Sequence, residues 1–321
     1  MNRRDFIALC ASLTAFPARA QTAMRTVGLW WSPAHVRELL PRYQQRLAGL
    51  GWVEGRNIRY EVRIWDGDIA NMRRQADELM AARPDLVVAL SNPAVAVLKP
   101  VSGEVPVVFA MVADPVGSGF IANLAHPGGH ITGFTNFEPS MGGKWLEVLR
   151  EAAPQMRRVL VLIHPETAAH NEFWRAIEQT AAPLGVEAIA AGVHRADEVE
   201  RAFASFTEGG QGGGVIALPH AVTEVNRDLI IRLALAQRMP SIFAFEAHAH
   251  AGALVTYGID RGDAIFRTAD YVNRILRGAK PADLPVQAAE RFELLVNLKT
   301  ANALGLTIPP TLLARADRVI E

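Results

Sequence analysis

Short apolar runs alternate with amphipathic stretches along the chain from Thr26 to the C-terminus. The apolar runs have the length of strands, and the stretches between them repeat apolar residues at helical spacing. Strands that are separated by single helices form a parallel sheet with right-handed crossovers. The pattern therefore predicts an α/β fold. In the first part of the chain we expect strands at 26–31, 57–65, 85–90 and 106–111, and helices at 35–51, 69–82 and 93–99.

The same pattern starts again after Asn136. In both halves a helix ends at a glycine, the pair Val-Glu follows, and a strand begins, as in "LGWVEGRNI" and "LGVEAIA". We interpret this as two doubly wound parallel-sheet lobes of similar plan rather than one long sheet. In this part we expect strands at 158–163, 185–193 and 213–218, and helices at 138–153, 170–183, 195–206 and 223–237.

After Met239 we expect the chain to return to the first lobe, with strands at 240–245 and 253–258 and a helix at 260–277. A stretch rich in Pro and Gly at 278–285 then serves as a connector, and the run at 292–298 completes the second lobe. Several crossings of this kind form a hinge with a cleft between the lobes. The predicted division is lobe one at 24–136 plus 240–283, and lobe two at 137–239 plus 284–321.

The N-terminus has the order of a secretory signal peptide over residues 1–20: Arg3 and Arg4, an apolar stretch, and Ala18-Arg19-Ala20 as the cleavage site. An N-terminal membrane anchor is the alternative, but about 20 apolar residues are needed to span a bilayer. The adjacent arginines suggest the twin-arginine export route. We therefore predict a periplasmic protein whose first mature residue is Gln21.

Composition narrows the class of partner. Of the 321 residues 50% are hydrophobic and 21% are charged, and the formal net charge is +0. Without a basic cluster, a nucleic-acid or anionic-membrane partner is not expected. The single cysteine, Cys10, lies in the predicted signal peptide, where lipidation is an alternative to cleavage after Ala20. The mature chain would then have no disulfide and no thiolate metal site.

Small polar residues stand beside proline or glycine where many of the predicted strands end. Carboxyl ends of parallel strands share one edge of the sheet, and ligands of open α/β sheets bind outside that edge. Such residues also cap the next helix and leave backbone N–H groups pointing toward a ligand. We therefore expect a ligand cleft there. The turns are Trp31-Ser32-Pro33, Trp65-Asp66-Gly67, Ser91-Asn92-Pro93, Ala113-Asp114-Pro115, His164-Pro165 and Pro219-His220.

Three of these residues have structural explanations as well. Asp114 can cap a following helix, or it can contact a ligand, because the two glycines after it remove side-chain bulk. Trp31 is either a core residue at a strand end or a wall of the cleft. Asn92 either closes a turn on the backbone or faces the ligand. The sequence leaves these alternatives open.

No arrangement of catalytic residues emerges from the motifs. The glycine-rich run at 209–214 lacks the Lys-Ser/Thr of a phosphate-binding loop, and no G-x-S-x-G motif occurs. His248 and His250 could bind a metal, but no acidic cluster accompanies them, so a solvated loop is favoured. We predict a protein that is not an enzyme, with no cofactor and no metal site.

Several stretches together resemble one family. "LGWVEGRNIRYEVR", "PVVFAMVADPVGSGFIANLAHPGGHITG", "LRGAKPADLPVQ" and "FELLVNLKTANALGLTIPPTLLARADRVIE" closely resemble ABC-transporter substrate-binding proteins of the tryptophan/tyrosine type. The resemblance covers essentially the whole mature chain. It implies a type I periplasmic-binding-protein fold, two lobes with three crossovers, and delivery of a small-molecule ligand to an ABC permease in the inner membrane. Some relatives bind aromatic amino acids, so an amino-acid-like or aromatic solute is expected, but the resemblance does not fix its identity.

The family's cleft falls on the turns already singled out. His130 and His164 stand where relatives commonly have Asn, and Glu246 stands where many have Arg, so the polarity of the ligand can differ. A ligand-sensing effector protein with the same two lobes is the alternative function, which would need a DNA-binding or membrane element. The predicted ligand-binding residues are Trp31, Ser32, Pro33, Ser91, Asn92, Pro93, Ala113, Asp114, Asn136, His164, Asn171, His220, Phe245 and Glu246.

Overall fold

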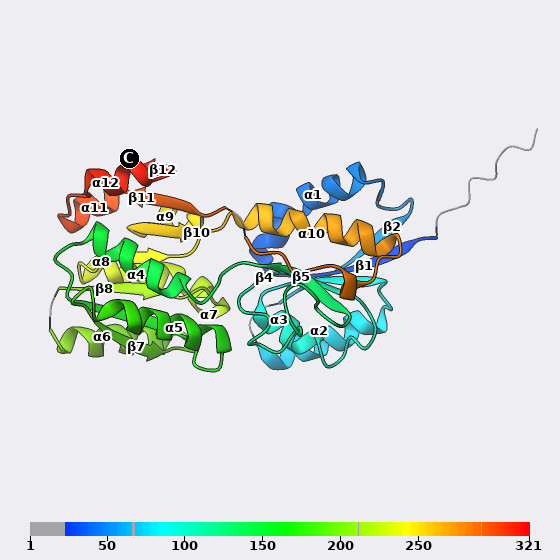
Figure 1. The fold of residues 1–321 in the computed structure, drawn as a ribbon, viewed down its shortest axis with the longest axis horizontal. Helices are drawn as coiled ribbons and strands as arrows, with labels where there is room; N and C mark the ends of the chain where they lie inside the picture. The colour runs from blue at the N-terminus through cyan, green and yellow to red at the C-terminus, as the bar shows by residue number, and fades with distance from the viewer. Residues whose placement is uncertain (1–22, 66–67, 211, 290) are drawn as a thin grey trace, which may run out of the picture.

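The chain forms two lobes that lie side by side, each built around one sheet (Figure 1). The computed structural model describes residues 23–65, 68–210, 212–289 and 291–321. The predicted signal peptide, residues 1–20, lies outside the described residues. Within the described part of the chain, no helix has both the length and the apolar character needed to cross a membrane.

Lobe one contains a five-stranded sheet with the order β2-β1-β3-β4-β5, in which all neighbours are parallel. Its central strands are buried along their full length, as expected for a parallel sheet with helices on both faces. The elements of this lobe are β1 (Arg25–Trp31), α1 (Pro33–Gly49), β2 (Ile58–Ile64), α2 (Ile69–Ala81), β3 (Leu86–Leu90), α3 (Asn92–Leu98), β4 (Val107–Val112), β5 (Ile131–Thr135), α10 (Arg261–Leu276) and the short 3₁₀ helix η1 (Pro281–Asp283).

Lobe two contains a seven-stranded sheet with the order β12-β11-β10-β9-β8-β6-β7. Only the pair β10 and β11 is antiparallel. Its elements are α4 (Met141–Ala152), β6 (Arg158–Ile163), α5 (Ala168–Ala181), β7 (Glu187–Gly192), α6 (Ala196–Glu208), β8 (Gly213–Ala217), α7 (Ala221–Val225), α8 (Arg227–Ala236), β9 (Ser241–Phe243), α9 (Glu246–His250), β10 (Val255–Gly258), β11 (Glu293–Asn297), α11 (Leu298–Leu304), α12 (Pro310–Arg315) and β12 (Arg318–Ile320).

The two sheets repeat the same strand order. The order β2-β1-β3-β4-β5 in lobe one corresponds to β7-β6-β8-β9-β10 in lobe two, so the prediction of two similar parallel-sheet lobes is confirmed. The prediction that strands 240–245 and 253–258 return to lobe one is wrong, because β9 and β10 continue the second sheet from β8. The segment that follows them returns instead: α10 packs against β4 and α1, and η1 packs against β5.

The hydrophobic pattern also did not reveal β5. β5 has only five residues, and its Gly133 lies directly against the backbone of Phe109 in β4. A side chain at position 133 would collide with that backbone, so this strand cannot carry a full run of β-branched residues. The predicted lobe one therefore lacked the strand that pairs with β4 at the edge of the sheet.

Among the described residues the chain crosses between the lobes three times, as the family resemblance implies: between β5 and α4, between β10 and α10, and between η1 and β11. Figure 1 shows α10 lying beside α1 in the lobe that contains β1. A buried hydrogen bond of 2.9 Å between the Tyr43 and Thr268 hydroxyls joins these two helices. Residues far apart in the sequence therefore complete the same lobe.

Candidate functional site

The site lies in a cleft of about 730 Å³ where the carboxyl ends of the strands of both lobes face each other. This is the place where ligands bind in open α/β sheets. One wall belongs to lobe one and the other to lobe two. Lobe one contributes Trp65, Ile69, Met72, Asn92, Pro93, Ala96, Ser118 and Phe120. Lobe two contributes His164, Glu166, Thr167, Ala168, His194, Arg195, Ala196, His220, Ala221, Val222, Val225 and Asn226.

The lobe-one wall is mainly apolar and is held in place by Asn92. The Asn92 side chain accepts a hydrogen bond of 2.9 Å from the Ala113 amide and donates one of 2.7 Å to the Ala113 carbonyl oxygen. Its amide nitrogen also lies 3.1 Å from the Ser118 hydroxyl. Asn92 therefore ties the loop after β3 to the loop after β4, which fixes the spacing of the apolar groups around it.

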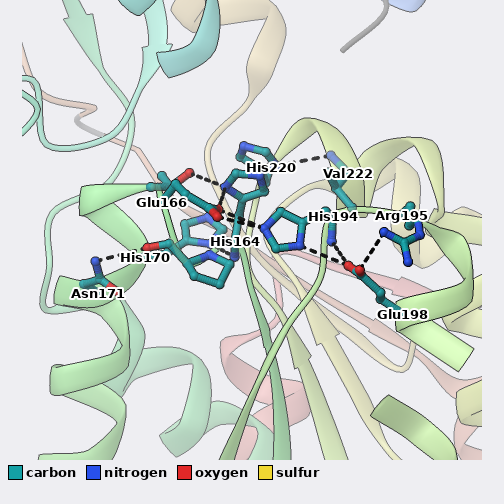
Figure 2. Close-up of polar contacts among 11 residues, drawn as sticks. His164, Glu166, His170, Asn171, His194, Arg195, Glu198, His220 and Val222 are labelled. Carbon is teal, nitrogen blue, oxygen red and sulfur yellow. Dashed lines mark hydrogen bonds and ion pairs between the residues drawn. The ribbon is translucent and has the colours of Figure 1, made fainter. Parts of the chain in front are cut away.

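The lobe-two wall is rich in histidine (Figure 2). His164 follows β6, His194 follows β7 and His220 follows β8, so three neighbouring strands each deliver one ring to the same edge. The rings of His164 and His220 stack with their centroids 4.1 Å apart. His194 meets His164 edge-on at 5.0 Å.

The Glu166 carboxylate lies between two of these rings. One of its oxygens is 3.3 Å from His164 Nδ1, and both are 3.0 Å from His194 Nε2. On its other side, the His194 ring places Nδ1 3.0 Å from the Glu198 carboxylate. The hydrogen bonds to Glu166 and Glu198 raise the pKa of His194 above its ordinary value. Figure 2 shows His164 and Glu166, from the loop after β6, meeting His194, which follows β7.

Beneath this group His170 is buried, and His220 beside it is partly buried. Burial lowers the pKa of His170 to about 4, so the ring is neutral at physiological pH. Its Nδ1 accepts from the His164 amide at 2.8 Å, which leaves Nε2 to donate to the Pro219 carbonyl at 3.3 Å. Burial, followed by the neighbouring histidines, lowers the pKa of His220 to about 2. The neutral His170 ring thus joins the loops after β6 and β8.

A second polar cluster lies where the lobes meet outside the cleft. Glu224 in α7 ion-pairs with His248 at 2.6 Å and with Arg261, the first residue of α10, at 3.0 Å. Burial alone would raise the pKa of Glu224, but His248 and the charges of Arg261 and His35 lower it to about 2. His35 in α1 is close enough for Arg261 and Glu224 to affect its own pKa. We call these four residues the junction group.

Four of the residues predicted from the sequence line the cleft: Asn92, Pro93, His164 and His220. Ala113 and Ser91 lie next to it, Ala113 through the Asn92 hydrogen bonds and Ser91 at the start of α3 with a φ of 88°. Whether these residues contact a ligand stays a prediction.

The predicted residues of the first lobe include several that lie outside the cleft lining. Trp31 is fully buried in the core against Tyr43, which is the structural alternative of the sequence analysis. Ser32 caps α1 and pairs with His35, and Pro33 is the first residue of that helix. Asn136 is buried, and its side chain accepts from the Phe137 amide.

Asp114 departs from the expected geometry. Its φ of 40° is not that of a helix cap, and residues 115–119 form turns rather than a helix. The carboxylate instead accepts a hydrogen bond of 2.8 Å from the Gly117 amide and closes that turn. The expectation of a helix beginning at Pro115 is therefore wrong. Asp114 does not line the cleft in this structure.

The remaining predicted residues of lobe two also lie outside the cleft lining. Asn171 in α5 donates to the Pro165 carbonyl at 3.4 Å. Phe245 is buried beneath Arg261, whose guanidinium is 4.8 Å from the ring centroid. Glu246 ion-pairs with His250 and Arg318. His130, one of the departures from the family, hydrogen-bonds to Ser102 and is not in the lining either.

Glu166, His194 and Arg195 line the cleft but were not predicted from the sequence. His164 and Glu166 are two residues apart, but His194 lies 28 residues beyond Glu166. It follows the predicted strand at 185–193, whose end carries no proline or glycine turn of the kind that marked the other strand ends. The position of His194 at the end of a strand could have revealed it, because β6 and β7 are neighbours and their carboxyl ends meet. Searching for charged or ring residues at the ends of all strands would have grouped His194 with His164.

Comparisons with known proteins agree with this architecture. The family model described as "ABC transporter substrate binding protein" matches residues 42–320. A tyrosine-binding protein from Clostridioides difficile is 22% identical over 260 residues, which cover 80% of this chain and 73% of that protein. A conserved domain protein from Vibrio cholerae superposes with a TM-score of 0.83 at 27% identity, covering 93% of this chain and 99% of that one.

A further solved structure shares the fold at lower sequence identity. It is an ABC domain from Streptococcus pneumonia in complex with L-Trp, with a TM-score of 0.85 and 22% identity. The match covers 93% of this chain and 100% of that chain.

Proposed function

The chain belongs to the ABC transporter substrate binding protein family, and on that basis we propose that it is the periplasmic receptor of an ABC importer. In this role it binds a small organic solute between its lobes and delivers it to a permease in the inner membrane. It acts by binding alone, without chemistry on the solute. The three-segment hinge supports this proposal, because it lets the lobes close around a solute that contacts both walls.

The main support for the proposal is the interlobe cleft. Its volume of about 730 Å³ falls within the range of small-molecule sites, which is roughly 300–1,000 Å³. Both lobes contribute to its lining, so a bound solute would stabilise the form in which the lobes are close together. A receptor that presents a closed form to its permease needs this property.

The two walls indicate an amphipathic solute. Trp65, Ile69 and Phe120 offer lobe-one contacts for an apolar or aromatic body. Arg195, whose side chain is 64% exposed, offers nitrogen donors on the lobe-two wall, which suit a carboxylate. An aromatic amino acid or an aromatic carboxylate has both parts, in keeping with the relatives named for tyrosine and crystallised with L-Trp.

The location of the protein is part of the same proposal. The order of charged, apolar and small residues over positions 1–20 supports export and cleavage after Ala20. N-terminal sequencing of protein recovered from the periplasm should show Gln21 as the first residue. Neighbouring genes for a permease and an ATPase would favour the importer over a ligand-sensing effector.

Isothermal titration calorimetry with tryptophan, tyrosine, phenylalanine and aromatic carboxylates tests the cleft. The decisive variant is Ala96→Trp, because Ala96 is exposed on α3 and lines the lobe-one wall. A large ring there should fill the cleft and weaken solute binding by at least tenfold, while the fold remains intact. The matched control is Ala204→Trp, an exposed alanine of α6 outside the cleft.

Binding that is equal in both variants would refute the cleft as the solute site. Failure of every solute in the panel to bind the unsubstituted protein would refute the proposed ligand class. Small-angle scattering with and without the best solute then tests closure, for which we expect contraction at saturation.

A further inference from the structure

The lobe-two wall brings together a donor set that the proposed function does not require. His164, Glu166 and His194 each offer one ligand atom, and these three atoms all lie within 4.8 Å of one another. We propose that this set binds one divalent transition-metal ion, of the zinc or nickel class, and that the metal holds the polar end of the solute. The second part rests on the proposed function, whereas the metal site itself does not.

The distances suit a metal ion of this size. Zinc bonds of about 2.0–2.2 Å to nitrogen and oxygen place neighbouring ligand atoms roughly 3.0–3.5 Å apart. Glu166 is 3.3 Å from His164 Nδ1 and 3.0 Å from His194 Nε2. All three atoms lie within 4.8 Å of one another, so an ion seated among them requires side-chain movements of about 1 Å. The Glu166 side chain is 65% exposed, so it has the freedom to make them.

A second set of contacts has the form of a metal site's outer shell. A histidine that binds a metal through one nitrogen usually donates its other N–H to a carboxylate or carbonyl, which fixes the ring. His194 Nδ1 lies 3.0 Å from Glu198, and the His194 amide donates to the same carboxylate at 2.7 Å. Arg195 holds the second oxygen of Glu198 at 2.9 Å. His194 Nε2 is thereby left to face Glu166.

No permanent cation competes for Glu166 within the described part of the chain. Its ion pairs there are with His164 and His194 alone, while the nearby Arg195 pairs with Asp197 and Glu198. A carboxylate that faced an arginine would already be paired with a permanent positive charge and would be a poorer metal ligand. Glu166 instead faces two imidazoles, which are themselves good ligands when neutral.

The donor types also decide the class of metal. Two imidazoles and one carboxylate favour Zn²⁺, Ni²⁺, Cu²⁺ or Fe²⁺, whereas Ca²⁺ and Mg²⁺ prefer oxygen ligands. Three protein ligands leave at least one coordination position open, as in zinc sites that bind water or substrate. Here that position faces the cleft, since all three residues line it or its rim. A carboxylate or amino group of the solute can occupy it.

The test uses the tag-free protein after treatment with EDTA and dialysis, with ZnCl₂ as the probe and no solute present. Titration against a chromogenic chelator, together with elemental analysis, should give one zinc per chain with a Kd at or below about 1 μM. His194→Ala should weaken zinc binding by at least tenfold, and Glu198→Gln by about tenfold to a hundredfold, in line with losses from outer-shell changes.

The matched control is His250→Ala. His250 also pairs with a glutamate, Glu246 at 3.1 Å, but it lies outside the cleft and outside the group of three. Zinc binding should be unchanged in this variant, and far-ultraviolet circular dichroism should show that all variants fold. Absence of stoichiometric zinc, or an equal effect of His194→Ala and His250→Ala, would overturn the inference.

Repeating the solute titrations in zinc and in EDTA separates the two proposals. Tighter binding of a carboxylate solute in zinc would support both. Solute binding that is equal with and without zinc would refute the metal's role in holding the solute and leave the receptor function standing. If zinc binds but none of the solutes does, the metal site is supported and the proposed solute class is refuted.

Discussion

Two groups of histidines and carboxylates lie where the lobes face each other, and they differ in what surrounds the carboxylate. In the junction group, Glu224 is held by Arg261 and His248 and has a pKa of about 2. On the cleft wall, Glu166 faces only histidines among the described residues and is 65% exposed. The residue types are nearly the same, but only the second group leaves its ligand atoms available.

The difference shows how one arginine decides the role of a histidine–carboxylate pair. Beside Arg261 the pair is a closed ion-pair network that joins α7 to the first turn of α10. Without an arginine at Glu166, the pair faces the cleft with open coordination capacity. We therefore expect substitutions in the junction group to act on stability and those in the cleft group to act on binding.

The largest effect on stability is expected for Glu224→Ala. The change leaves Arg261 and His248, whose side chains are 19% and 4% exposed, without their shared carboxylate. Because hydrogen bonds to charged groups contribute about 1.5–3 kcal/mol each, the free energy of unfolding should fall by about 3 kcal/mol. Urea unfolding followed by tryptophan fluorescence measures this.

The control is Glu147→Ala, which removes an exposed ion pair with Lys144. That change should cost no more than about 0.5 kcal/mol. If the two variants lose similar amounts, the junction group is no more than a surface ion pair, and the contrast between the groups fails.

A smaller effect should appear on acidification, through His35. Burial, and then the charge of Arg261, lower its pKa to about 4, against an ordinary value of 6.5. Between pH 6.5 and 4 the unfolded chain binds a proton that the folded chain does not, so stability falls as the pH falls. From pH 7.5 to 5 this loss amounts to about 2 kcal/mol for His35.

The variant His35→Leu should lose less stability over that range than the unsubstituted protein, by about the same 2 kcal/mol. Glu224 does not interfere, because its own stabilising contribution disappears only below about pH 4.5. The exposed His126, changed to Leu, serves as the control. Parallel pH profiles for the His35 variant and the unsubstituted protein would show that His35 is not held neutral by its surroundings.

The smallest effect on stability is expected where the carboxylate of the cleft group is replaced by a cation. Glu166→Arg replaces an exposed side chain, so the metal-free protein should change in unfolding free energy by no more than about 0.5 kcal/mol. Zinc binding should nevertheless disappear. If the variant still binds zinc as the unsubstituted protein does, another set of ligands holds the metal, and a large loss of stability would show that Glu166 has a structural role.

Much of the fold follows from periodicity. The strands at 158–163 and 85–90 were predicted to within one residue, because each is apolar after its first residue, as expected for buried parallel strands. Sheet membership was harder. β9 has three residues and β10 four, and nothing local in such short strands tells which sheet they join.

The candidate site was predicted only in part, for a related reason. Position at a strand end found His164 and His220, since that rule depends on topology and not on side-chain detail. It could not exclude Trp31, because a tryptophan at a strand end looks the same whether it turns into the core or into the cleft. Glu166 and His194 meet only through the pairing of β6 with β7, which spacing along the chain does not reveal.

The three crossings between the lobes have a consequence for the order of folding. Lobe one needs α10, whose Thr268 meets Tyr43 across 225 positions, and lobe two needs β11, which pairs with β10 after α10 has gone to the other lobe and come back. Neither lobe is therefore complete until nearly all of the chain has been synthesised. Contacts over such separations make folding slow, so the unfinished chain exposes apolar sheet faces for a long interval. Lobe two is therefore expected to fold only after its last segment of about thirty residues, from β11 to the C-terminus, is available.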